Sequence, residues 1–206
     1  DRYGAHAEHL YIGDRFIPDI GFLRRSDIRR SFGQLRFSPR IPGSKTIRKL
    51  YFIGSNLYVE TTDGRLHTRD WRGEFQIEFQ NSDRFVASYG GTYEFVPRPT
   101  EIVGLIIPTG PYDYASTMGG YDFGQQRRLS GFVSLQTGSF YDGDKTSFSV
   151  SQGRFNATPQ LSIEPMYLGN WVHPPQGSST THLVGSRITY TMSPTMFVSA
   201  LLQYNS

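Results

Sequence analysis

The side chains of this chain best suited to chemistry are arginines gathered near its beginning. They are Arg24, Arg25, Arg29, Arg30, Arg36 and Arg40. Because a guanidinium group binds phosphate, sulfate or carboxylate through two parallel hydrogen bonds, arginines that line a pore would favour anionic solutes. The alternative, which we favour, is that they pair with carboxylates on facing strands, such as Asp70, Glu74 and Glu78.

Two further arrangements point less strongly to chemistry. His6, Glu8 and His9 are residue types that bind metals, but a strand would place His9 on the face opposite the other two. Glu74 and Glu78 lie about 13 Å apart in an extended strand, which is wider than the carboxylate pairs of glycoside hydrolases. We therefore expect no metal and no cofactor, and we favour a protein that is not an enzyme.

Aromatic side chains offer another kind of contact, because flat rings stack on sugars. The candidates are Trp71, Tyr89, Tyr93, Tyr167, Trp171, Tyr190 and Tyr204. The alternative, which we favour, places these rings at a membrane interface, where side chains with an apolar body and a polar edge are stabilised.

The elements that must position these residues are strands, and the segment 65–80 shows the pattern most clearly. From residue 70 one set of alternate positions is polar: Asp70, Arg72, Glu74, Gln76, Glu78 and Gln80. The other set is Trp71, Gly73, Phe75, Ile77 and Phe79. Successive strand side chains point to opposite faces, so this strand has one charged and one aromatic face. Such long two-faced strands are typical of a barrel wall with water inside and lipid outside.

Strand-like runs separated by turn residues fill the rest of the chain. They cover residues 4–13, 28–38, 47–61, 65–80, 84–95, 102–107, 112–124, 128–140, 145–155, 161–171, 181–192 and 195–205. Asp63-Gly64 and Asp142-Gly143 predict tight hairpin turns, since Asp-Gly favours two-residue turns. We interpret this pattern as about eleven strands in one domain.

Composition excludes several other classes of protein. Only 37% of the residues are hydrophobic and no apolar run reaches about 18 residues, so a helical membrane protein is excluded. The absence of cysteine excludes disulfides, thiolate metal sites and cysteine catalysis. Because 21 Lys and Arg nearly balance 18 Asp and Glu, we expect no nucleic-acid partner.

Four phrases of the sequence carry a resemblance to a known family. They are DRFIPDIGFLRR (14–25), SFYDGDK (139–145), RITYTMSPTMF (187–197) and SALLQYNS (199–206). In this order they resemble an uncharacterised bacterial family whose outer-membrane-type barrel follows an N-terminal sugar-binding-like β-sandwich. The resemblance implies a surface-anchored barrel without established catalytic residues. It also implies a sandwich in front of this chain and further strands after it, so we expect a segment of a larger barrel.

The sequence thus predicts an all-β fold: residues 1–206 form one domain, an incomplete segment of an antiparallel up-and-down transmembrane β-barrel in a bacterial outer membrane. We expect Arg24, Arg25, Arg29, Arg30, Asp70, Arg72, Glu74 and Glu78 to face the lumen. We expect Trp71, Phe75, Ile77 and Phe79 to face lipid.

The predicted function is a porin-like structural anchor or a pore. The expected partners are the lipid bilayer, further strands or a partner protein that completes the barrel, and a small solute or glycan. The alternatives are a soluble all-β carbohydrate-binding module and a barrel-borne hydrolase.

Overall fold

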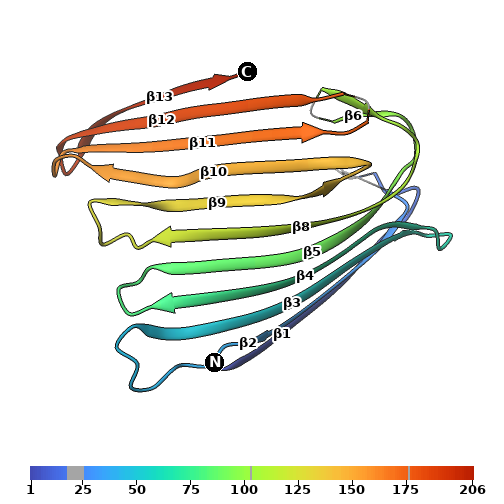
Figure 1. Cartoon of the computed structure of the whole chain (residues 1–206), viewed down its shortest axis with the longest axis horizontal. Helices are drawn as coiled ribbons and strands as arrows, with labels where there is room; N and C mark the ends of the chain where they lie inside the picture. Colours follow the sequence, from blue (N-terminus) through green and yellow to red (C-terminus); the bar gives the residue numbers. More distant parts are fainter. Residues whose placement is uncertain (18–25, 103, 176) are drawn as a thin grey trace.

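The computed structural model describes residues 1–17, 26–102, 104–175 and 177–206, and these form strands joined by turns and loops (Figure 1). The strands are β1 Tyr3–Ile12, β2 Ile28–Phe37, β3 Ile47–Thr61, β4 Leu66–Phe79, β5 Arg84–Val96, β6 Thr100–Ile102, β7 Leu105–Ile107, β8 Gly110–Phe123, β9 Leu129–Phe140, β10 Gly143–Asn156, β11 Leu161–His173, β12 Ser179–Ser193 and β13 Met196–Asn205. The predicted all-β fold is confirmed. Within the described ranges, no helix is long and apolar enough to cross a membrane.

Eleven of these strands form a single antiparallel sheet that follows chain order. Each strand pairs with its sequence neighbours, except that β5 pairs with β8 because β6 and β7 form a separate hairpin. The predicted up-and-down order and strand number are therefore confirmed. The sheet is not closed into a barrel, because the outer edges of β1 and β13 have no strand partner among the described residues.

The alternation of side chains gives the sheet two different faces. The inner face carries Phe32 of β2, Leu57 of β3, Asp70 of β4 and Thr92 of β5, which the strand register places side by side. The outer face carries the residues between them, including Phe52, Phe75 and Ala87 in one row and Trp71 in another.

Glycines show toward which face the sheet curves. A Cβ added to Gly90, on the inner face, would lie 2.6 Å from the carbonyl oxygen of Trp71, whereas one added to Gly54, on the outer face, would meet nothing within 4 Å. Side chains converge on a concave surface and diverge on a convex one. The inner face is therefore concave and the outer face convex.

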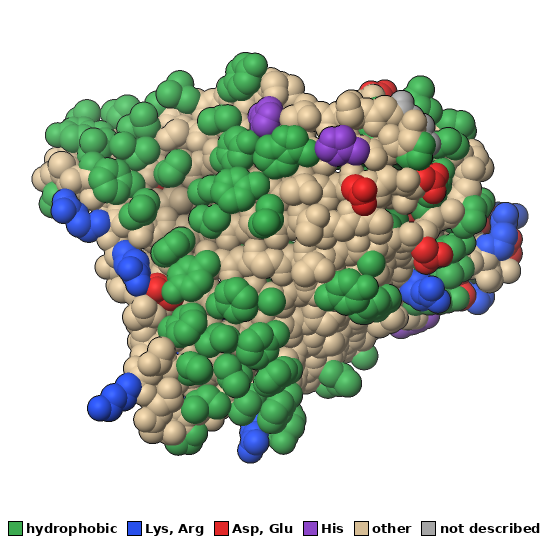
Figure 2. Space-filling view, in the orientation of Figure 1, with side chains coloured by type: hydrophobic (Ala, Val, Ile, Leu, Met, Phe, Trp, Pro, Cys, Tyr) green, Lys and Arg blue, Asp and Glu red, His purple; other side chains and the backbone are tan. Residues whose placement is uncertain are grey.

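No second layer of described residues covers the outer face. Phe75, Ile77 and Phe79 are only half-buried, and Leu135 in the middle of β9 is 52% exposed. Figure 2 looks onto this face and shows apolar side chains spread over both halves of the sheet, with most charged side chains toward the ends of the strands. The sheet is thus a single curved layer whose outer face is open.

The hairpin of β6 and β7 corrects the predicted strand over residues 102–107. Thr100–Ile102 pairs with Leu105–Ile107 instead of joining the sheet, and the hairpin lies at the end of the sheet where β5 ends and β8 begins (Figure 1). Ile107 is 1% exposed and packs in the main apolar cluster with Val96, Tyr112 and Tyr141. Since Val96 and Tyr112 belong to the inner face, the hairpin folds over that face.

The predicted turns are present, one with a shifted position. Gly64, with a φ of 87°, closes the turn between β3 and β4 as expected for Asp63-Gly64. Between β9 and β10 the two central residues are instead Tyr141 and Asp142, because Phe140 pairs with Gly143. Tyr141 adopts a φ of 52°, which is uncommon for a bulky residue, and its packing against Phe140 and Tyr112 stabilises that conformation.

Candidate functional site

The candidate site is a hollow of about 800 Å³ on the inner face, which we call the trough. It runs across β1 to β5 and reaches β8 and β9. One wall is apolar, with Leu10, Ile28, Phe32, Leu57 and Val59. Arg30 lies among these apolar side chains, whereas the other wall is polar, with Thr68, Asp70, Arg72, Thr92, Glu94, Tyr114, Ser116 and Gln136. A larger, shallow hollow of about 960 Å³ lies over Gly54 and Gly73 on the outer face, but its walls are mainly aromatic and aliphatic and offer no arrangement for chemistry.

Charges along the trough are mostly matched. Arg30 makes an ion pair with Glu8, its diagonal neighbour across the β1–β2 ladder. Asp70 and Arg72 carry opposite charges two positions apart on β4, and neither has an ion pair or a hydrogen bond to another described residue. Both side chains are thus available to a polar solute.

The predicted arginine cluster is divided between the two faces of the sheet. Arg30 and Arg36 lie on the inner face, whereas Arg29 lies on the outer face, 3.7 Å from Glu60 and over the ring of Tyr11. The reason is the two-residue period of a strand, which cannot place neighbours on one face. Arg24 and Arg25 lie outside the described residues. The six arginines therefore do not form one anion site.

The predicted pairing of these arginines with carboxylates of β4 takes a different form. Glu78 pairs with Arg48, at 3.0 Å, and accepts a hydrogen bond from the Tyr51 hydroxyl at 2.9 Å. Glu74 accepts a hydrogen bond from the Gln76 side-chain amide. No arginine of the cluster has an ion pair with Asp70, Glu74 or Glu78 in the described structure. The arginine partner of this strand thus comes from β3.

Beyond the trough the inner face is lined by small polar side chains. Gln136 donates to the Ser116 hydroxyl at 3.0 Å, and Ser134 and Ser149 share a hydrogen bond of 2.8 Å. Ser147 donates to Asn170 at 2.8 Å, and Asn170 donates to Thr181 at 3.2 Å. These bonds cross β8 to β12 and keep the middle of this part of the face polar, whereas Lys145, Glu164 and Arg187 place charges toward the strand ends.

A second hollow, the vestibule, lies between the sheet and the hairpin of β6 and β7. Its volume is about 550 Å³, and Asp27, His67, Glu94, Arg98 and Ile102 are among its walls. Glu94 lines both hollows and therefore lies where they meet. The sequence did not single out Glu94, although its place on the polar side of the run 84–95 was the signal that could have done so.

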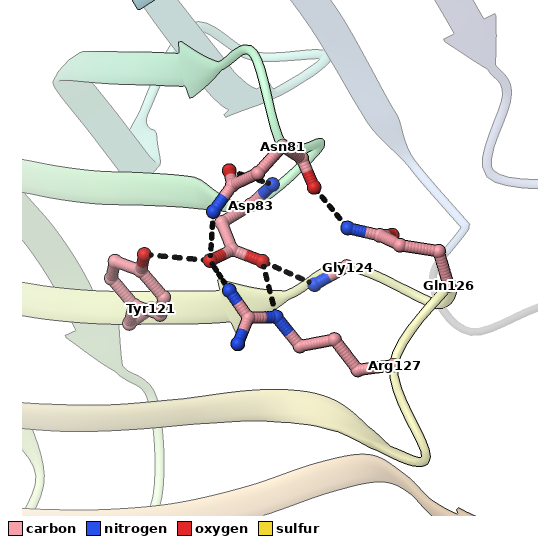
Figure 3. Close-up of polar contacts among 6 residues, drawn as sticks. All are labelled: Asn81, Asp83, Tyr121, Gly124, Gln126 and Arg127. Carbon is pink, nitrogen blue, oxygen red and sulfur yellow. Dashed lines mark hydrogen bonds and ion pairs between the residues drawn. The ribbon is translucent and has the colours of Figure 1, made fainter. Parts of the chain in front are cut away.

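Asp83 anchors a polar network at the opposite end of the sheet (Figure 3). Only 1% exposed, it joins the β4–β5 turn to the β8–β9 turn. It accepts hydrogen bonds from the Gly124 amide at 2.8 Å, the Tyr121 hydroxyl at 3.0 Å, the Asn81 side-chain amide at 2.9 Å and two guanidinium nitrogens of Arg127 at 2.6 and 3.2 Å.

The electrostatics of Asp83 are those of a structural anion. Burial alone would raise its pKa, but the hydrogen bonds from Gly124, Arg127 and Tyr121 outweigh burial and hold the pKa below its usual value. Every lone-pair direction of the carboxylate is used inside the protein, so we assign this network to fold stability and not to a ligand.

The remaining candidates do not form sites. His9 lies opposite His6 and Glu8 in the β1 alternation and bonds to the Ser31 hydroxyl at 3.0 Å. Over the described ranges, no three His, Asp or Glu side chains gather as metal ligands would. Trp71 packs edge-on against Tyr89 on the outer face, and the other five candidate aromatics lie on that same face. They are therefore not placed to stack on a sugar in the trough.

No family model, curated protein or solved structure matches this chain. The family resemblance carried by its phrases therefore stays a prediction.

Proposed function

We propose that this chain forms part of the wall of a β-barrel in a bacterial outer membrane, with its outer face against lipid and its inner face lining a water-filled lumen for small polar solutes. The observation that carries the proposal is the uncovered outer face. Large apolar side chains such as Leu35, Leu135 and Leu202 stay more than half exposed there. A water-soluble protein rarely leaves so extensive an apolar surface open.

Strand length and the chemistry of the two faces support the same proposal. The sheet strands have 10 to 15 residues, and about 9–11 residues suffice for a tilted strand to cross the hydrocarbon core. Polar side chains on one face and apolar ones on the other are the alternation of outer-membrane barrels. The carbohydrate-binding alternative requires a second layer over one face, and the described residues provide none.

The unpaired edges support completion of the barrel by other strands. In hydrocarbon, each unpaired backbone N–H or C=O costs several kcal/mol, so β1 and β13 need partners there. Because the sheet has an odd number of alternating strands, β1 and β13 run in the same direction. An antiparallel ring therefore requires an odd number of additional strands, from elsewhere in the protein or from a partner chain.

Two neighbouring residues of β9 provide the test. Leu135 lies on the outer face and Gln136 on the inner face, both near the middle of the strand. We expect Leu135→Arg to lower the free energy of unfolding in lipid vesicles by about 2–4 kcal/mol, because it places a charge in hydrocarbon. Gln136→Arg, whose side chain faces water, should change it little. Equal, small effects of both substitutions would contradict insertion in this orientation.

A further inference from the structure

We propose that Glu94 and the β6–β7 hairpin form a constriction that makes the lumen prefer cations to anions. The inference rests on the proposed function, since it requires that the inner face line a lumen. Its starting point is position: the trough and the vestibule meet at Glu94, so a solute moving along the inner face passes this carboxylate.

The carboxylate of Glu94 is fixed by two hydroxyl groups. Tyr114 and Tyr141 each donate a hydrogen bond of 3.1 Å to the same oxygen, Oε2. The other oxygen, Oε1, accepts no hydrogen bond from the described residues, and Glu94 has no ion pair among them. One oxygen is therefore held while the other stays available to a passing solute.

The hairpin determines how closely a solute approaches Glu94. Ile102 and Ile107 pack in the cluster that contains Tyr112, Tyr114 and Tyr141, so Tyr114 and Tyr141 belong both to the packing of the hairpin and to the binding of the carboxylate. The hairpin also reaches the β11–β12 loop, where Leu105 approaches Gly177. This packing makes it a fixed narrowing of the inner face.

Where the two hollows meet, no described cation forms an ion pair with Glu94, and the nearby Lys145 lies instead over the Phe140 ring. In the trough Arg30 is paired with Glu8, and Asp70 and Arg72 offset each other. In the vestibule the carboxylate of Asp27 accepts a hydrogen bond from the Thr62 hydroxyl. Arg98, which carries the opposite charge, lines the same hollow. Acidic side chains at a narrowing of a pore favour cations, and Glu94 supplies that charge here.

Ion selectivity of the protein, extracted in its folded form and inserted into planar lipid bilayers, tests the proposal. Under a KCl gradient the reversal potential gives the ratio of K⁺ to Cl⁻ permeability. We expect a preference for K⁺ that Glu94→Gln lowers about fivefold, as expected when a unit charge about 4 Å from an ion in water is removed. Glu60→Gln is the matched control, because Glu60 lies toward the same end of the sheet but on the outer face.

A second variant keeps the proposal testable if glutamine disturbs the cluster. The chain has no cysteine, so Glu94→Cys introduces a single thiol. An anionic thiol reagent should restore the K⁺ preference and a cationic reagent should reverse it. If the channels conduct normally but neither Glu94→Gln nor these reagents changes the ion selectivity, the proposed constriction is wrong, although the pore itself is still supported. Absence of any conductance would overturn the pore, and the selectivity with it.

Discussion

Asp83 is the residue whose environment depends most on its charge. Asn at this position keeps the size of the side chain but leaves Arg127 without its counter-charge. Its amide NH2 group would also face groups that donate hydrogen bonds, such as the Gly124 N–H or the Arg127 guanidinium. We predict that Asp83→Asn lowers the free energy of unfolding by about 2–3 kcal/mol, the range for hydrogen bonds to a charged group. Urea unfolding of the folded protein measures the change.

The control for this substitution is Asp63→Asn in the exposed β3–β4 turn. Asp63 also pairs with an arginine, Arg65, at 2.8 Å, but both side chains are more than half exposed. Exposed pairs contribute little, so this variant should unfold almost as the wild type does. Similar losses from both variants would show that Asp83 has no special role.

The lowered pKa of Asp83 predicts a dependence of stability on pH. The unfolded chain binds a proton at this carboxyl near pH ~3.9, whereas the folded protein binds it only at lower pH. The contribution is therefore complete above about pH 4 and is lost as the pH falls through the folded-state pKa. Between about pH 4 and pH 2 the wild type should lose more stability than Asp83→Asn. Parallel curves of unfolding free energy against pH would contradict this assignment.

At the scale of elements, the β6–β7 hairpin provides a matched pair of substitutions. Ile107 is 1% exposed and packs in the tyrosine cluster, whereas its neighbour Ile106 is 65% exposed. Ile107→Ala should lower the free energy of unfolding of this region by about 2–4 kcal/mol through lost contacts and a cavity. Ile106→Ala should change it by no more than about 0.5 kcal/mol.

Limited proteolysis measures both variants, since a released hairpin is cleaved between β5 and β8. Faster cleavage of Ile107→Ala alone is the expected result. If both variants resist cleavage as the wild type does, the hairpin is not held by its buried isoleucine, and the fixed constriction has no support.

Sequence alternation predicted the sheet well because the two-residue period of a strand is a local property. The bounds of β3 match the predicted run 47–61, and those of β4 lie within the run 65–80. The local pattern predicts one strand over residues 102–107, because the hairpin depends on packing against Val96 and Tyr112, which lie outside that run. The shifted turn at Tyr141 has the same cause, since aromatic packing overrides the preference of Asp-Gly.

Only some residues of the candidate site could be predicted from the sequence. Asp70 and Arg72 were placed together because they share one face of one strand. Arg29 was grouped with Arg30 by closeness in sequence, although strand geometry separates them. Glu94 became visible only when the fold brought Tyr114 and Tyr141 to it, which is a contact across three strands.

For the whole molecule, the decisive property is the contrast between an exposed apolar surface and a polar concave one. Such a sheet in water would leave its outer face open to solvent, whereas in a bilayer that face is covered by acyl chains. Both tryptophans, Trp71 and Trp171, belong to the outer face, so they report on the environment of that surface.

Quenching of tryptophan fluorescence by lipids with brominated acyl chains measures this environment directly. The protein with Trp171→Phe retains only Trp71, and a comparison variant with Trp71→Phe, Trp171→Phe and Leu57→Trp places the single tryptophan in the trough. We predict strong quenching of Trp71 by brominated lipid, and quenching of the tryptophan at position 57 by aqueous iodide instead. Trp71 that responds to iodide but not to brominated lipid would contradict a lipid-facing outer surface.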